Sequence, residues 1–168
     1  LFKNQYESIN WCIDFLKLNK NFILIVKSHP CMKGLNFPYV FRNLKKLKID
    51  NLFYLSPESS VSSYKVLEIS DICIGFSSTM LIEAVYKKIP TILVGDTFFN
   101  NLEICEEPNS MKELEDSLNK GLFKKNLLVN DNQFQNSISF GKVMESTDGV
   151  KFNLHNWNLF NVTKPFPY

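Results

Sequence analysis

The sequence predicts an α/β protein in which helices alternate with the parallel strands of a doubly wound sheet. Short apolar segments of β-forming residues recur along the chain, and segments with helical spacing of apolar residues lie between them. The first of these strand segments is apolar at every position, which is typical of strands covered on both faces by helices. Strict alternation of the two kinds of segment favours a parallel sheet with helices on both sides.

The composition narrows the class of protein further. The chain has 168 residues, 45% of them hydrophobic, and a net charge of +2. It is therefore too apolar for a disordered protein and too weakly basic for general binding to nucleic acid. The longest wholly apolar run covers only residues 22–26, whereas a bilayer-spanning helix needs roughly 20 apolar residues. Arg42 is the sole Arg, so we expect any phosphate site to use Lys, His, hydroxyl or backbone N–H groups.

The N-terminal half opens with a predicted helix over residues 7–19, where apolar side chains recur with near-helical spacing. The apolar run 22–26 predicts the first strand. A lysine-rich helix over 39–48 and a short strand over 51–55 follow. A Ser-Pro turn then leads into a helix over 61–69.

The C-terminal half begins with a predicted strand over 71–75, followed by a Ser-Ser-Thr helix cap at 77–79 and a helix that ends near Lys88. A strand over 91–94, an acidic helix over 111–119 capped by Ser110, and a weaker helical stretch over 131–146 come next. The last segment is aromatic and has no period. We therefore expect one domain over 1–146 and an irregular C-terminal tail over 147–168.

Polar clusters directly after strands are the candidates for function, because the carboxyl ends of parallel strands form the ligand-binding edge of such sheets. Lys27 and His29 follow the strand 22–26 within the sequence Lys-Ser-His-Pro. A histidine there can donate a hydrogen bond to a phosphate and stabilise it as a leaving group. A solvated loop histidine is the plain alternative.

A second cluster, Ser77, Ser78 and Thr79, follows the strand 71–75 and opens a helix. Hydroxyls and free N–H groups at a helix start can hold an anion, although an ordinary helix cap has the same composition. Glu83 lies about one turn beyond Thr79. Its carboxylate could accept hydrogen bonds from a ribose diol, or it could simply be an exposed helix carboxylate.

Other chemistries lack their signatures. The chain has no GxxxxGK phosphate loop, GxGxxG, GxSxG or HExxH motif, and its two histidines form no metal-spaced set with Cys or carboxylates. We therefore expect no metal ion and no cofactor. The four Cys show no regular spacing and predict no disulfide scaffold, which together with the lack of a signal peptide favours a cytoplasmic location.

The Lys-Ser-His-Pro segment and the sequences SSYKVLEISD, ICIGF and SSTMLIEAVYKKIPTILVG together resemble the C-terminal, donor-binding half of GT-B glycosyltransferases, a Rossmann-like domain. The resemblance covers about residues 20–96. It is greatest to the bacterial capsule and surface-polysaccharide group, which includes sialyltransferases, Kdo transferases and CDP-glycerol glycerophosphotransferases.

The resemblance implies roles for individual residues. His29 would contact the donor phosphate and assist its departure as the catalytic residue. The substrate-binding residues would be Lys27, Ser77, Ser78, Thr79 and Glu83, with Glu83 near the ribose or sugar and residues 57–63 near the base. The sequence departs from the pattern of this family in two places. Lys65 and Glu68 occupy the region where some relatives carry a ribose-binding carboxylate, and Lys88 replaces the Gly of a "G-x-P" segment.

The resemblance also implies partners. The substrate would be a nucleotide-sugar, with a CMP-linked donor expected first, and the acceptor a glycan or lipid-linked glycan. Acceptor site and general base would belong to an N-terminal domain that is absent from this chain. Because the chain opens with Leu1 instead of Met, we expect a fragment. The resemblance implies that this half is inactive alone, since it lacks the acceptor site and the general base. Peripheral association of the parent enzyme with the inner membrane face stays open. So do two alternatives, a nucleotide-sugar 2-epimerase-like half and a non-catalytic α/β interaction domain.

Overall fold

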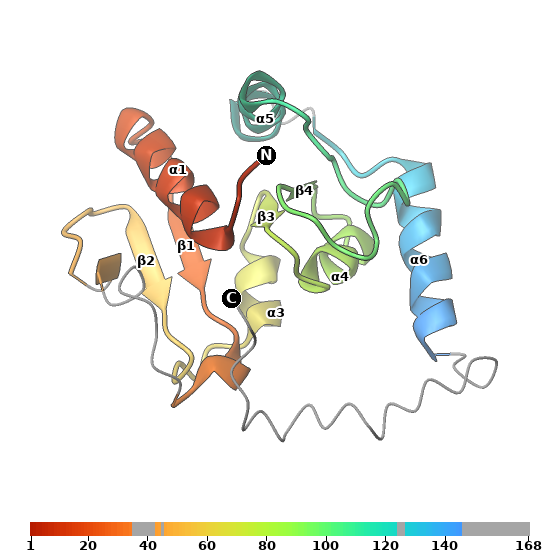
Figure 1. The fold of residues 1–168 in the computed structure, drawn as a ribbon, viewed down its shortest axis with the longest axis horizontal. Coiled ribbons are helices and arrows are strands. Elements are labelled where there is room, and N and C mark those ends of the chain that lie inside the picture. Colours follow the sequence, from red (N-terminus) through yellow and green to blue (C-terminus); the bar gives the residue numbers. More distant parts are fainter. Residues whose placement is uncertain (35–42, 45, 124–126, 146–168) are drawn as a thin grey trace.

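The structure, a computed structural model, describes residues 1–34, 43–44, 46–123 and 127–145 (Figure 1). Its elements in chain order are α1 (Gln5–Leu18), β1 (Leu24–Lys27), η1 (Pro30–Met32), β2 (Leu52–Leu55), α3 (Ser63–Glu68), β3 (Cys73–Gly75), α4 (Met80–Tyr86), β4 (Thr91–Leu93), α5 (Met111–Leu118), η2 (Asn119–Phe123) and α6 (Asp131–Glu145). The mixed α/β class and the alternation of helices with strands are confirmed. Half of the helix predicted over 39–48 falls outside the described residues; of the other half, residues 43–44 are helical and 46–48 are not. The tail 147–168 falls wholly outside the described residues.

The strands form two separate parallel pairs. β1 pairs with β2, with Leu24 opposite Leu52, and β3 pairs with β4, with Cys73 opposite Thr91. Over the described ranges no ladder joins the two pairs, so the structure does not show one continuous doubly wound sheet. Each strand is only three or four residues long.

The two pairs also differ in burial. All three residues of β4 are buried, whereas every residue of β1 is half-buried. Ile23, just before β1, is 67% exposed, and Phe53 in β2 is 51% exposed. The expectation that the strand 22–26 is covered on both faces is therefore wrong. An apolar run predicts a strand, but it does not show whether another element covers each face.

Helix α1 connects the two strand pairs. It lies beside β1 (Figure 1), and its buried Ile13 belongs to a cluster with Leu24. On another side, Trp11 and Phe15 pack against the cluster that contains Leu114 of α5, together with residues of β3 and β4. One amphipathic helix thus contributes to the apolar core of both strand pairs.

Several helices begin directly after a residue whose side chain accepts backbone N–H groups of the first turn. The Asn4 side chain accepts two backbone N–H bonds of the first turn at 3.0 Å, so α1 begins two residues before its predicted start. Ser110 caps α5 as predicted. Asn130 and Gln133 exchange side chain–backbone hydrogen bonds of 2.9 and 3.0 Å. This reciprocal capping fixes the start of α6, which periodicity alone had left weak.

Helix α6 packs along α4 in the C-terminal half of the described chain (Figure 1). The rings of Tyr86 and Phe134 stack with centroids 5.9 Å apart. Phe98 and Phe99 in the loop after β4 contact Phe140 of α6. Among the described residues, no helix has the length and apolar character needed to cross a membrane.

Candidate functional site

A cleft of about 440 Å³ opens at the carboxyl ends of β1 and β3 and takes its lining from three loops. Its lining residues are Lys27, His29, Pro30, Ser59, Ser60, Val61, Ser62, Ser63, Tyr64, Ser78, Thr79, Met80 and Glu83. The volume lies within the range of small-molecule sites. The polar side chains among them carry hydroxyl, imidazole, ammonium or carboxylate groups, and Pro30, Val61 and Met80 add apolar surface.

The first wall consists of the last residue of β1 and the extended backbone just after it, where side chains point alternately to opposite sides. Lys27 and His29 line the cleft. Ser28 between them is only 4% exposed, and its hydroxyl lies 3.0 Å from the Tyr54 hydroxyl on β2. The Ser28 N–H also donates to the Leu55 carbonyl at 2.9 Å. Because successive side chains of extended backbone face opposite ways, anchoring Ser28 inside directs its two neighbours to the cleft.

His29 has a defined local role as well. It precedes η1, with Pro30 at the first position of that turn, and its Nδ1 accepts the Cys31 N–H at 3.1 Å. The imidazole is otherwise exposed. Nδ1 is thus engaged with the backbone, and Nε2 is the ring nitrogen left for a ligand.

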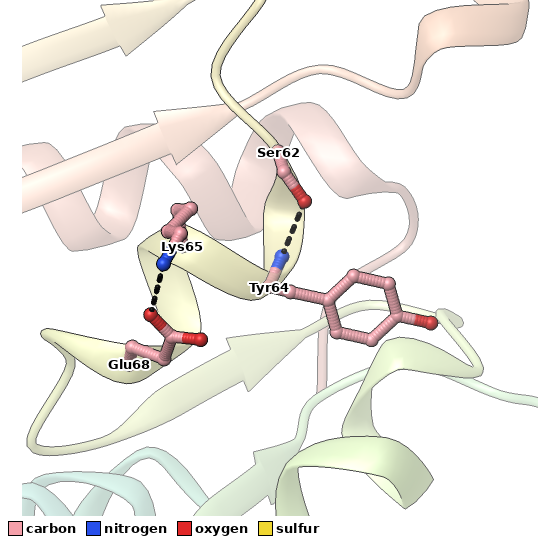
Figure 2. A network of polar contacts seen from close by, with 4 residues as sticks. All are labelled: Ser62, Tyr64, Lys65 and Glu68. Atoms are coloured by element: carbon pink, nitrogen blue, oxygen red, sulfur yellow. Dashed lines mark hydrogen bonds and ion pairs between the residues drawn. The ribbon is translucent and has the colours of Figure 1, made fainter.

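The second wall is the loop between β2 and α3. Ser59, Ser60, Ser62 and Ser63 line the cleft there together with Tyr64. The Ser62 hydroxyl caps α3 by accepting the Tyr64 N–H at 3.2 Å (Figure 2). The resemblance had led us to expect a ligand near this segment, but no sequence argument singled out Tyr64. The run of serines between a strand and a helix was the available signal.

The third wall follows β3 at the start of α4. Ser78 and Thr79 are exposed and line the cleft, as does the half-buried Glu83 one turn further. Ser77 is exposed as well, but it is not among the lining residues. The Ser78 hydroxyl accepts the Met80 N–H at 3.3 Å, whereas the Thr79 side chain makes no capping bond. The predicted cap of this helix is therefore provided by Ser78.

Tyr64 and Glu83 connect two of these walls. A hydrogen bond from the Tyr64 hydroxyl to the Glu83 carboxylate, with the charge of that carboxylate, raises the pKa of Tyr64. The Lys87 ammonium lies 5.9 Å from the centre of the Tyr64 ring. Figure 2 shows the Tyr64 ring extending away from the Lys65–Glu68 pair on the same helix.

That pair itself lies outside the cleft. Lys65 and Glu68 are bonded to each other at 3.0 Å, both are exposed, and neither is a lining residue. Glu68 therefore does not take the position of a ribose-binding carboxylate in this structure. Glu83 is the carboxylate that lines the cleft.

The loop after β4 carries Glu106 and Glu107, and both carboxylates stabilise the loop through hydrogen bonds. Glu107 accepts hydrogen bonds from Asn100 and Asn101, and Glu106 accepts one from Gln133 on α6 at 3.4 Å. These contacts hold the loop in place away from the cleft residues. Within the described residues, no group of three or more His, Cys, Asp or Glu side chains is arranged to hold a metal ion.

Five of the six residues singled out from the sequence thus line one cleft, namely Lys27, His29, Ser78, Thr79 and Glu83, while Ser77 lies just outside it. Positive and donor groups stand after β1 and a carboxylate stands on α4, so the cleft can bind a ligand that carries both an oxyanion and hydroxyl groups. Comparison of the chain with models of known protein families, with curated proteins and with solved structures finds no match.

Proposed function

We propose that the chain is the donor-binding half of a GT-B glycosyltransferase and that the cleft binds a nucleotide-sugar. One observation carries the proposal: Lys27 at the end of β1 and His29 just after it line the same cleft as Ser78, Thr79 and Glu83 after β3. These residues lie some fifty positions apart in the sequence. The proposal takes β1–β2 and β3–β4 as parts of one Rossmann-like, doubly wound arrangement.

The chemistry of glycosyl transfer suits these side chains. When the bond between the anomeric carbon and the phosphate oxygen breaks, negative charge develops on the departing phosphate. Donors aimed at that charge lower the barrier. In the proposal His29 and Lys27 stabilise the leaving phosphate, the hydroxyls of Ser78 and Thr79 add hydrogen bonds, and Glu83 accepts hydroxyls of the ribose or sugar.

The proposal assigns the remaining parts of the reaction to a separate N-terminal domain. That domain would carry the general base and would bind a glycan or lipid-linked acceptor, for surface-polysaccharide synthesis in the cytoplasm or at the inner membrane face. A CMP-linked donor is our first choice. No metal enters the proposed mechanism.

Chemical-shift perturbation by NMR tests the proposal directly. The chain is titrated with CMP, CDP, UDP and inorganic phosphate. We expect shifts centred on His29, Ser78 and Glu83, with one nucleotide binding more tightly than the others. Lys27→Ala should weaken that binding about tenfold, since a charge-assisted hydrogen bond is lost. Lys142→Ala, which removes an exposed lysine of α6, is the matched control and should bind like the unaltered chain.

Two results would contradict the proposal. Titration with every nucleotide to millimolar concentration without shifts at the cleft would mean that the chain holds no donor site. Equal loss of binding in Lys27→Ala and Lys142→Ala would place the ligand elsewhere. Either outcome favours the alternative of a non-catalytic interaction domain.

A further inference from the structure

The strand pair β1–β2 has two apolar faces, and one of them belongs to an apolar cluster. The side chains of that face pack in the cluster of Ile13 on α1, and they are Leu24, Val26, Leu52 and Tyr54. Because successive side chains of a strand point to opposite faces, the positions next to them form the other face. We call it the outer face, and its residues are Ile23, Ile25, Phe53 and Leu55. Ile25 and Phe53 are paired in register, so both strands contribute to one surface.

The outer face is exposed. Ile23 is 67% and Phe53 51% exposed. Over the described ranges, no residue of the outer face belongs to any of the three apolar clusters. The strand pair β3–β4 differs, because one of its faces packs against α4 and the other against α1 and α5. Within the described part of the chain, the outer face is therefore the strand face that has no apolar partner.

The C-terminal tail is apolar enough to need such a surface. From Lys151 to Tyr168 it carries eight large apolar side chains, five of them aromatic, two lysines and no Asp or Glu. Segments that stay solvated have few aromatic residues and a high net charge, and this composition is the opposite. Each buried aromatic side chain removes about 150 to 250 Å² of surface from water. The composition of the tail therefore favours burial against an apolar surface.

The tail is also long enough to reach the outer face. Figure 1 shows α6, which precedes the tail in the chain, on the opposite side of the described structure from β2. The chain from Glu145 to Trp157 can extend about 40 Å, and a compact domain of this size is about 40 Å across. Since the tail and the strands belong to one chain, their association requires no encounter between molecules.

Other exposed aromatic side chains already have partners. Phe98 is 68% exposed, but its ring lies 5.9 Å from the ring of Phe140 on α6. Tyr86 is 61% exposed, but its ring stacks on that of Phe134. Both rings are thus partly covered by α6. The outer face, with four apolar side chains from two paired strands, offers a larger free surface to a long apolar segment.

We infer that the C-terminal tail, residues 147–168, packs on the outer face of β1–β2 and buries Trp157 against Ile25 and Phe53. This packing completes a second apolar layer on that strand pair, opposite α1. The inference goes beyond the proposed function, because it holds whichever ligand the cleft binds. By the same alternation along β1, the outer face continues to Lys27, which lines the cleft. The packed tail therefore lies next to the cleft.

Trp157 reports on this packing when it is the sole tryptophan. The other tryptophan, Trp11, stacks on Phe15, so Trp11→Phe keeps an aromatic ring there. In this background we expect the emission of Trp157 to be blue-shifted relative to the urea-unfolded chain. Phe53→Glu should remove most of that shift, since a carboxylate opposes the burial of apolar surface beside it. Phe98→Glu changes an exposed phenylalanine outside the outer face; it is the matched control and should keep the shift.

Nuclear Overhauser effects in the unaltered chain test the contact without relying on a substitution in the strands. With labelled isoleucine methyl groups, we expect cross-peaks between the methyl protons of Ile25 and the indole protons of Trp157. These cross-peaks should be absent in Trp157→Ala, which identifies them. A mixture of methyl-labelled and unlabelled chains detects contacts between two copies, and we expect no such cross-peaks in it.

Several results would overturn the inference. Emission of Trp157 like that of the urea-unfolded chain would show that the tail is not buried. Equal loss of the blue shift in Phe53→Glu and Phe98→Glu, or a buried Trp157 without cross-peaks to Ile25, would place the tail on another surface. Cross-peaks in the mixed sample would show that a second copy covers the outer face. If circular dichroism shows that Phe53→Glu does not fold, the cross-peaks of the unaltered chain decide.

Discussion

Tyr64 on α3 and Glu83 on α4 line the same cleft, and the Glu83 carboxylate raises the pKa of the Tyr64 hydroxyl through hydrogen bonding and through its charge. The two residues belong to elements that follow different strands, so this interaction relates two walls of the cleft.

Glu83→Gln should lower the pKa of Tyr64 toward the ordinary tyrosine value of about 10. The carboxylate favours the protonated phenol, and a neutral amide removes that charge. An NMR titration that follows the ring signals of Tyr64 measures the change. Glu68→Gln is the matched control on α3, because Glu68 is paired with Lys65. An equal effect of both substitutions would show that Glu83 is not the cause of the raised pKa.

Cys31 should be the reactive thiol of the native protein. Of the four cysteines it is the exposed one. Burial raises the pKa of Cys12 to about 12, and that of Cys73 and Cys105 to about 11. The thiolate is the nucleophile, so iodoacetamide at pH 8 should label Cys31 alone in native protein and all four cysteines in urea, as read by mass spectrometry. Labelling of native Cys12 at a similar rate would contradict the buried environment.

The same burial predicts a loss of stability at alkaline pH. The three folded-state pKa values lie above the thiol value of 9.0, so the protonated thiols stabilise the fold fully below pH 9. Above pH 9 the unfolded chain releases these protons first, and the free energy of unfolding falls by about 1.4 kcal/mol per pH unit for each thiol. Cys12→Ala should show a shallower decline between pH 9 and 11 in urea titrations. An unchanged slope would contradict the assignment.

Gly95→Ala should destabilise the protein by about 3 kcal/mol. A Cβ atom at Gly95 would overlap the carbonyl oxygen and the ring of Phe76, and the backbone atom cannot move aside without shifting β3. Gly141→Ala is the control, since a Cβ there meets nothing within 4 Å. As Gly141 lies in α6, alanine should stabilise the protein by about 0.5 to 1 kcal/mol. Urea unfolding curves measure both changes, and similar values for the two variants would contradict the argument.

Lys88 adopts a left-handed conformation, with φ of 62°, just after α4. This conformation costs a non-glycine residue about 1 kcal/mol, while the Lys88 ammonium lies 3.5 Å from the centre of the Phe134 ring, a favourable contact. The two effects should nearly cancel in Lys88→Gly. In a Phe134→Leu background the ring contact is already absent, so the same change should stabilise by about 1 kcal/mol. Equal effects in both backgrounds would mean that the contact contributes nothing.

Much of the local structure could be predicted because its causes are local. Apolar runs located all four strands within two residues of their observed starts, and Ser110 marked the start of α5. Periodicity identified α1, although Asn4 moved its start two residues earlier than expected. The left-handed turn at Lys88 was not predicted, because glycine is the usual residue in such a turn after a helix and this chain has a lysine there.

The cleft could be predicted only in part. Strand ends with polar residues indicated Lys27, His29, Ser78, Thr79 and Glu83, which the structure brings into one lining. Whether Ser77 or Ser78 faces the cleft depends on the turn into α4, and the role of Tyr64 depends on α3 lying beside α4. The local pattern of residues along the sequence predicts neither of these two relations.

The sequence by itself therefore determined the mixed α/β class, the order of the elements and the residue types at the strand ends. Those properties follow from side-chain periodicity, turn residues and caps, which act over a few positions. The tertiary structure decided how strands pair, that α1 contacts both cores, and that Glu83 acts on the pKa of Tyr64. These relations depend on contacts between residues that are distant in the chain, and their free energies come from the burial and geometry that folding creates.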